Sequence, residues 1–169
     1  MPLSLYEISV PVFIRGLTNL SVILSKGSTY ADAQNLPPAH LLESRLVDDM
    51  APLPFQIGRA SDHAKNAAAR VAGVELLVMP DDEVTFEELQ ARIQKTIDFL
   101  KTVPQDSMDG KEGVEIVLKV KAGELKWTAK SYLLDFALPN FYFHVTTAYD
   151  ILRHNGVPVG KVDFIGGFK

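Results

Sequence analysis

The chain has 169 residues, a length typical of one domain, and 47% of them are hydrophobic, which is enough to build a sizeable core. Its charged residues make up 22% and leave a net charge of −4, which argues against a nucleic-acid partner and against an anionic membrane surface, because both need clustered Lys and Arg. The absence of cysteine excludes disulfides, thiolate metal sites and a cysteine nucleophile. We therefore expect one soluble domain over residues 1–169.

The apolar residues 8–14 do not resemble a targeting segment. Glu7 precedes them, Arg15 follows them, and neither a positive leader nor a small-residue cleavage site is present. No apolar run approaches the roughly 20 residues that a membrane-spanning helix needs. We expect a cytoplasmic, bacterial-type protein with no membrane partner.

The first predicted element is an amphipathic helix over residues 4–26. Pro11 is expected to distort or separate its first turn, and Gly27 to end it. Residues 28–54 hold four prolines and a possible short helix at 40–46, and a connection this long indicates a crossover. The apolar stripe of the helix recurs at steps of three and four and consists of Tyr6, Val10, Phe13, Leu17, Leu20 and Leu24.

The second predicted helix spans Phe55–Ala72 and is closed by Gly73. His63 falls on its inward face among small residues, and the alanines there predict a close approach between helices. Asp62 and Lys65 are interpreted as a surface ion pair at i, i+3 spacing. The inward face consists of Ala60, His63, Ala64, Ala67, Ala68 and Val71, and the solvated face of Arg59, Asp62, Asn66 and Arg70.

A third helix begins after a capping box formed by Thr85 and Glu88, and it ends before Pro104. Between residues 114 and 130 the apolar period changes from helical to alternating, with a turn at Ala122-Gly123. This pattern predicts a β-hairpin, too small to be stable alone.

The last predicted helix spans Ser131–His154 and ends at Asn155-Gly156, with a kink at Pro139. The tail, residues 157–168, is expected to pack back on the helices. One face of the last helix carries Leu133, Ala137, Asn140, His144, Thr147 and Ile151.

Polar groups on that face are the candidate chemistry of the chain, because buried polar groups are costly unless they are paired. Asn140, His144 and Thr147 either hydrogen-bond across the core or surround a ligand, a metal or water, and His63 faces inward on another helix. His40 is expected to be exposed, and His154 lies in the last helical turn, where a cation suits the helix dipole. The aromatic cluster of residues Phe136, Phe141, Tyr142 and Phe143 indicates core packing or docking of a second subunit.

Three stretches of the sequence carry a family resemblance: LYEISVPVFIRGL near the start, LLVMP after the small-residue helix, and FALPNFYFHVTTAYDILRHNGV near the end. In the last, a histidine is followed eight residues later by Leu-Arg and then by glycine. Nearly the whole chain is similar to an uncharacterised bacterial branch of the DinB-like (DinB/YfiT) superfamily. The resemblance implies a mainly α, up-down-down-up four-helix bundle with a long crossover and a small β-hairpin before the last helix, often a homodimer.

The resemblance also implies a site. His144 matches the last of three metal-binding histidines, His63 is a candidate for another, and Asn140 stands where relatives carry a histidine. The implied pocket is His63, Asn140, His144 and Thr147, and His63, Asn140 and His144 would hold a divalent metal such as Zn or Ni. Asparagine is a weak ligand for these metals. One hypothesis is a dimeric small-molecule-binding or structural module with a degenerate metal site. The alternative is a divalent-metal-dependent enzyme of the thiol-transferase or isomerase type.

Overall fold

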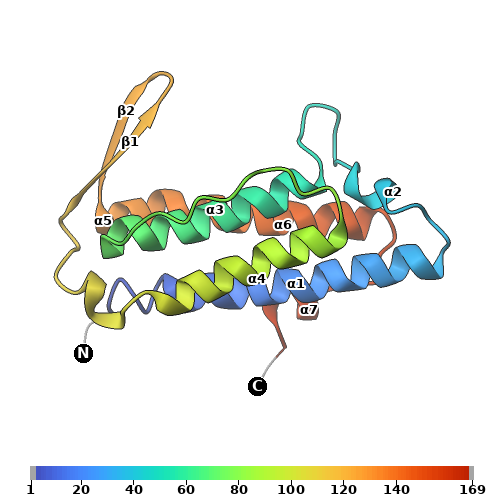
Figure 1. Ribbon diagram of the computed structural model, residues 1–169, viewed down its shortest axis with the longest axis horizontal. Helices are drawn as coiled ribbons and strands as arrows, with labels where there is room; N and C mark the ends of the chain where they lie inside the picture. The colour runs from blue at the N-terminus through green and yellow to red at the C-terminus, as the bar shows by residue number, and fades with distance from the viewer. Residues whose placement is uncertain (1–2, 168–169) are drawn as a thin grey trace.

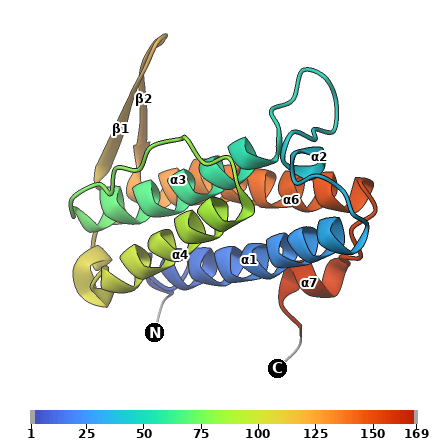
Figure 2. The ribbon, with the colours of Figure 1, turned by 45° about the vertical axis from the view of Figure 1, so that its right-hand side comes forward.

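The computed structural model describes residues 3–167, and four long helices dominate it: α1 (Val10–Ala33), α3 (Leu53–Ala72), α4 (Phe86–Thr102) and α6 (Leu138–His154). α1 and α6 run in one direction and α3 and α4 in the other, as the colour gradient in Figure 1 and Figure 2 shows. α1 packs on α4 and α6, and α3 packs on the same two helices. The predicted up-down-down-up bundle is therefore confirmed.

α1 forms as its apolar stripe predicts, with Val10, Phe13, Leu17, Leu20 and Leu24 buried. Pro11 lies in the first turn, after separate turns over residues 5–9, because proline needs no backbone N–H there.

The predicted end of α1 at Gly27 is wrong, because the helix continues to Ala33. An added Cβ at Gly27 would lie 3.0 Å from a methyl carbon of Leu152, so this glycine allows α6 to approach closely and does not stop the helix.

The long crossover lies after α3 and not in residues 28–54. Residues 34–52, which include α2 (Ala39–Leu42), join α1 and α3 at one end of the bundle. Residues 73–85 instead run the length of the bundle to join the parallel helices α3 and α4.

Gly73 (φ 76°) ends α3 in the left-handed conformation, as predicted. The predicted capping box is present, since Thr85 accepts from the Glu88 N–H and Glu88 from the Thr85 N–H.

The predicted hairpin is formed by β1 (Glu115–Val120) and β2 (Gly123–Thr128), after a short 3-10 helix, η1 (Gln105–Met108). It stands away from the bundle at one end, and residues 43–52 rise on the same side at the other (Figure 1). At its base the Ile116–Trp127 pair packs inward, and the Trp127 ring lies 4.9 Å from that of Phe136. At its tip Val120 and Leu125 are exposed.

The last helical stretch changes type before the predicted kink. Ala129–Ser131 is α-helical (α5), Tyr132–Ala137 is a π-helix (η2), and α6 follows with Pro139 in its first turn. Pro139 is thereby tolerated, because its missing N–H falls where the hydrogen-bond pattern already changes.

The predicted inward face of the last helical stretch is confirmed in part, because Leu133, Ala137, Thr147 and Ile151 are buried. Asn140 and His144 on the same face are only half-buried. Buried as well are four residues that the prediction left out: Phe141, Val145, Ala148 and Leu152. The C-terminal tail packs against the helices as expected: Val157 and Val159 are buried, and α7 (Lys161–Ile165) lies on α1. Residue 168, the last of the predicted tail, lies outside the described residues. No helix in residues 3–167 is long and apolar enough to span a membrane.

Candidate functional site

His63 of α3 and His144 of α6 lie face to face along the seam between their helices. Their ring centroids are 5.6 Å apart and their planes are within 14° of parallel. The ring centroid of Phe136 lies 5.7 Å from that of His63, and the ring centroid of Phe143 lies 5.2 Å from that of His144. The structure thus brings two of the predicted site residues together, among aromatic side chains.

Gln56, in the first turns of α3, fixes the tautomer of His144. Its Nε2 donates to the Ala51 carbonyl at 2.8 Å, so its Oε1 is the atom that lies 2.8 Å from His144 Nδ1. An amide oxygen only accepts, and therefore His144 carries its proton on Nδ1. The other ring nitrogen, Nε2, then presents a lone pair, and a second residue orients the ring as in many ligand-binding histidines.

Both imidazoles are neutral near pH 7. The pKa of His63 is lowered to about 4, mainly by burial and then by the positive charge of Arg59, against the opposing effect of Asp62. Burial also lowers the pKa of His144 to about 4, helped by His63 and then Arg59. A neutral imidazole accepts hydrogen bonds and binds metals, whereas an imidazolium does neither.

Asn140 and Thr147 are satisfied within their own helical stretch. Asn140 Nδ2 donates to the Phe136 carbonyl at 2.7 Å, and Thr147 Oγ1 donates to the Phe143 carbonyl at 2.7 Å. The three polar groups of this face therefore do not hydrogen-bond to one another. Among the residues that the structure describes, no cluster of three or more His, Asp or Glu side chains is arranged to hold a metal ion.

Sequence reasoning missed Gln56 and Arg59 as members of this region. Gln56 is only 2% exposed, and it precedes Ala60 and Ala64 at steps of four, so the periodicity that placed His63 inward also reaches it. Arg59 lies 5.4 Å from the centroid of the Phe55 ring, and that ring lies 6.2 Å from His144. His40 is exposed, as expected, and His154, in the last turn of α6, is also exposed and outside the pair.

A partly buried ionic network, with Arg92 and Lys65 buried and Asp81 exposed, lies next to His63 in the sequence of α3, where the crossover passes α3 and α4. The Arg92 side chain is 1% exposed and contacts Asp62 at 2.9 Å, Asp81 at 3.0 Å and Glu83 at 2.8 Å. Lys65 pairs with Asp62 at 2.9 Å and has a side chain only 5% exposed. The predicted surface pair of Asp62 and Lys65 is therefore wrong, because α4 and the crossover cover it.

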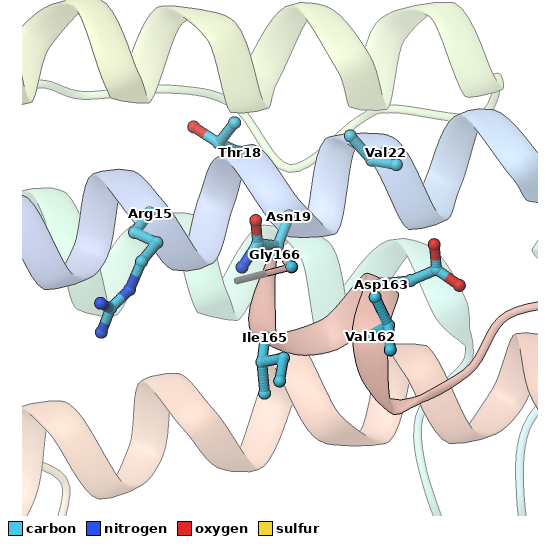
Figure 3. Close-up of a pocket in the computed structure, with 9 residues that line it drawn as sticks. Arg15, Thr18, Asn19, Val22, Val162, Asp163, Ile165 and Gly166 are labelled. Carbon is cyan, nitrogen blue, oxygen red and sulfur yellow. The ribbon is translucent and has the colours of Figure 1, made fainter. Parts of the chain in front are cut away.

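A separate groove of about 670 Å³ runs between α1 and the C-terminal segment (Figure 3). Asn19 spans it and donates from Nδ2 to the Phe164 carbonyl at 3.0 Å. Its walls contain none of the four residues of the predicted pocket.

Comparisons with known proteins agree with this architecture. A protein family described as "Domain of unknown function (DUF1993)" matches residues 5–165. A crystal structure described as that of a DinB family member protein from Shewanella denitrificans is similar, with 35% sequence identity and a TM-score of 0.91. The similarity covers 97% of this chain and 93% of that one. The comparison with curated proteins finds no match.

Proposed function

The chain belongs to the DUF1993 family, a DinB-like domain of unknown function, and we propose that its histidine pair binds a small molecule instead of serving as a catalytic metal centre. The observation that carries the proposal is the Gln56–His144 hydrogen bond of 2.8 Å, which leaves His144 Nε2 as an oriented acceptor beside a second neutral imidazole. The ligand this favours has an aromatic body and one hydrogen-bond donor. Phe136 and Phe143 border the pair and supply aromatic surface.

The donor set fits a tightly held divalent metal only in part. His63 and His144 are neutral and suit Zn or Ni, but protein sites for zinc commonly use three or four His, Cys or carboxylate ligands. The third candidate, Asn140, has a neutral amide whose nitrogen is engaged with Phe136. Two imidazoles and one weak oxygen therefore support a degenerate metal site.

A divalent-metal-dependent enzyme of the thiol-transferase or isomerase type is the second candidate. It is favoured by one observation, the low pKa of both histidines, because neither proton has to be displaced for metal to bind at neutral pH. In that case His63, Asn140 and His144 would hold the ion, which would supply Lewis-acid chemistry at an open position.

Two measurements on tag-free protein separate the candidates. The first follows the imidazole nitrogens by NMR during titration with phenol and, as a matched control, anisole, which lacks the donor. Phenol is expected to shift His144 Nε2, anisole to leave it unchanged, and His144→Ala to remove the response. His154→Ala, at an exposed histidine outside the pair, is expected to behave as the parent chain.

The second measurement is elemental analysis after loading with zinc, nickel or manganese and exhaustive dialysis. We expect well under one ion per chain. One retained ion per chain that is lost in both His63→Ala and His144→Ala would overturn the small-molecule proposal and favour the enzyme. An equal response to phenol and anisole would also contradict it.

A further inference from the structure

The hairpin of β1 and β2 has one polar face and one apolar face. In an antiparallel pair, residues directly opposite each other and every second residue along a strand share a face. One face carries charged or polar side chains and a single valine: Glu115, Val117, Lys119, Glu124, Lys126 and Thr128. The other carries Gly123 and only apolar side chains: Ile116, Leu118, Val120, Leu125 and Trp127. This contrast is typical of a sheet with one face in water and the other packed against a second layer.

The bundle covers only the base of the apolar face. Ile116 is buried and Trp127 packs on Phe136, whereas Val120 is 44% exposed and Leu125 is 42% exposed. A two-stranded hairpin is marginally stable in water by itself. The uncovered apolar half of this projecting arm, residues 115–128, therefore indicates a contact surface.

A second exposed apolar cluster lies at the other end of the layer formed by α3 and α6. Its members are Val47, Phe55 and Phe143, and all three are exposed. The rings of Phe55 and Phe143 both lie next to His144. Val47 belongs to residues 43–52, which rise on the same side of the bundle as the arm (Figure 1, Figure 2).

The two ends also carry complementary charges. Lys119 and Lys121 near the tip of the arm, and Asp48 and Asp49 at the other end, are exposed. None of these four side chains forms an ion pair within residues 3–167. Arg45, the cation nearest to the two aspartates in the sequence, donates to two backbone carbonyls instead. Two free cations at one end thus correspond to two free carboxylates at the other.

We propose that two copies of the chain form a homodimer about a two-fold axis, with the arm of each docked on the Val47–Phe55–Phe143 cluster of the other. The arm rises beside Arg70, which donates to Tyr132 Oη at 3.1 Å, and the Tyr132 ring lies 5.8 Å from that of Trp127. His63 lies about midway along α3 between Phe55 and Arg70. An axis at the level of His63 therefore carries the arm of one copy onto the cluster of its partner, and the same contact forms twice.

A second copy is the occupant because this chain supplies both halves of the contact. The apolar side chains of the arm cover the exposed aromatic rings, and Lys119 and Lys121 meet Asp48 and Asp49 of the other copy. The docked arm also borders the histidine pair of the partner, since Phe55 and Phe143 flank His144. The dimer does not depend on the ligand proposed above, so a failed phenol titration would leave it standing.

The first test is sedimentation equilibrium of the full chain over a range of concentrations. We expect a dimer, and we expect Leu125→Asn to raise its Kd at least about tenfold. Val117→Asn is the matched control, because Val117 is 36% exposed on the polar face of the same hairpin and its loss should change Kd less than about threefold. Thermal unfolding of both variants checks that the bundle is equally stable in each.

The second test exchanges the charges. One variant combines Lys119→Glu with Lys121→Glu, and the other combines Asp48→Lys with Asp49→Lys. Each alone places like charges at both contacts and is expected to raise Kd about tenfold or more. An equimolar mixture is expected to restore dimerisation, because in the mixed dimer glutamates meet lysines at one contact and lysines meet aspartates at the other.

Three results would each overturn the proposal. The first is a chain that stays monomeric at every concentration. The second is an equal effect of Leu125→Asn and Val117→Asn, which would place the dimer contact elsewhere. The third is a mixture of the two charge variants that dimerises no better than either variant alone.

Discussion

The low pKa values of His63 and His144 make the stability of the fold depend on pH. The folded pKa of each is about 4, below the unfolded value of 6.5, so the unfolded chain binds more protons. The stabilisation is therefore fully present above pH 6.5 and is lost as the pH falls from there toward 4. The pair is therefore expected to make the fold less stable at pH 5 than at pH 7.

The size of the effect follows from linkage. A single group with these two pKa values loses about 1.8 kcal/mol between pH 7 and pH 5, and two independent groups would lose about 3.7 kcal/mol. Both rings are half-exposed, and the pKa of His144 is lowered partly by His63 itself, so solvent screening and coupling reduce the expected loss. We expect about 2 kcal/mol for the pair.

The assay is urea unfolding at pH 7, 6 and 5, with the parent chain compared with a double variant, His63→Gln and His144→Gln. The parent is expected to lose about 2 kcal/mol more than the double variant over this range. NMR titration of the two rings provides a direct check. Parallel pH profiles for the two proteins, or ring pKa values near 6.5, would refute the reasoning.

Three further substitutions test the packing. Arg92→Met removes a buried partner of three carboxylates and should lower the free energy of unfolding, measured with urea, by about 3–5 kcal/mol. Lys101→Met, in an exposed pair, is the control, and an equal loss in the two variants would contradict the burial of Arg92. Gly16→Ala should lower the unfolding free energy by about 1–3 kcal/mol, because its Cβ would meet the Phe141 ring at 2.6 Å, and an unchanged chemical denaturation midpoint would count against that contact. Thr85→Ala should cost about 1 kcal/mol in thermal unfolding because the helix cap is lost, and a neutral result would mean that the Glu88 carboxylate alone caps α4.

The helices were predictable because the local signals and the core agree on them. The capping box at Thr85, the left-handed stop at Gly73 and the apolar stripe of α1 each satisfy a local requirement that the tertiary structure preserves. At Gly27 they disagree: the local preference of glycine for helix ends is outweighed by the close packing of α1 against α6. The type of a single residue in the sequence does not show which side chains that residue will contact in the folded chain.

The approach of His63 to His144 was predictable from helical periodicity together with family resemblance. The half-buried state of His144 was not predictable, because Thr147 and Ile151 on the same predicted face are buried and helical periodicity does not distinguish them from His144. The π turn of η2 changes the relation between residues before and after it, and a regular period of 3.6 cannot represent that change.

The ionic network was misjudged for a similar reason. Asp62 and Lys65 look like a surface pair in one helix, and only the path of the crossover buries them.

The homodimer, the cytoplasmic location and the metal stay predictions.

The π-helix η2 also determines how α6 is rotated about its axis relative to the residues that precede it. A helix advances about 100° with each residue, so one residue removed from Tyr132–Ala137 to restore a regular α-helix would rotate everything before the turn by that angle relative to α6. Phe136 would leave the side of His63, and the hairpin, which is joined to this stretch through Trp127, would swing to a different face of the bundle. Length variation in this family at that point would therefore alter the surroundings of the histidine pair without changing any residue in it.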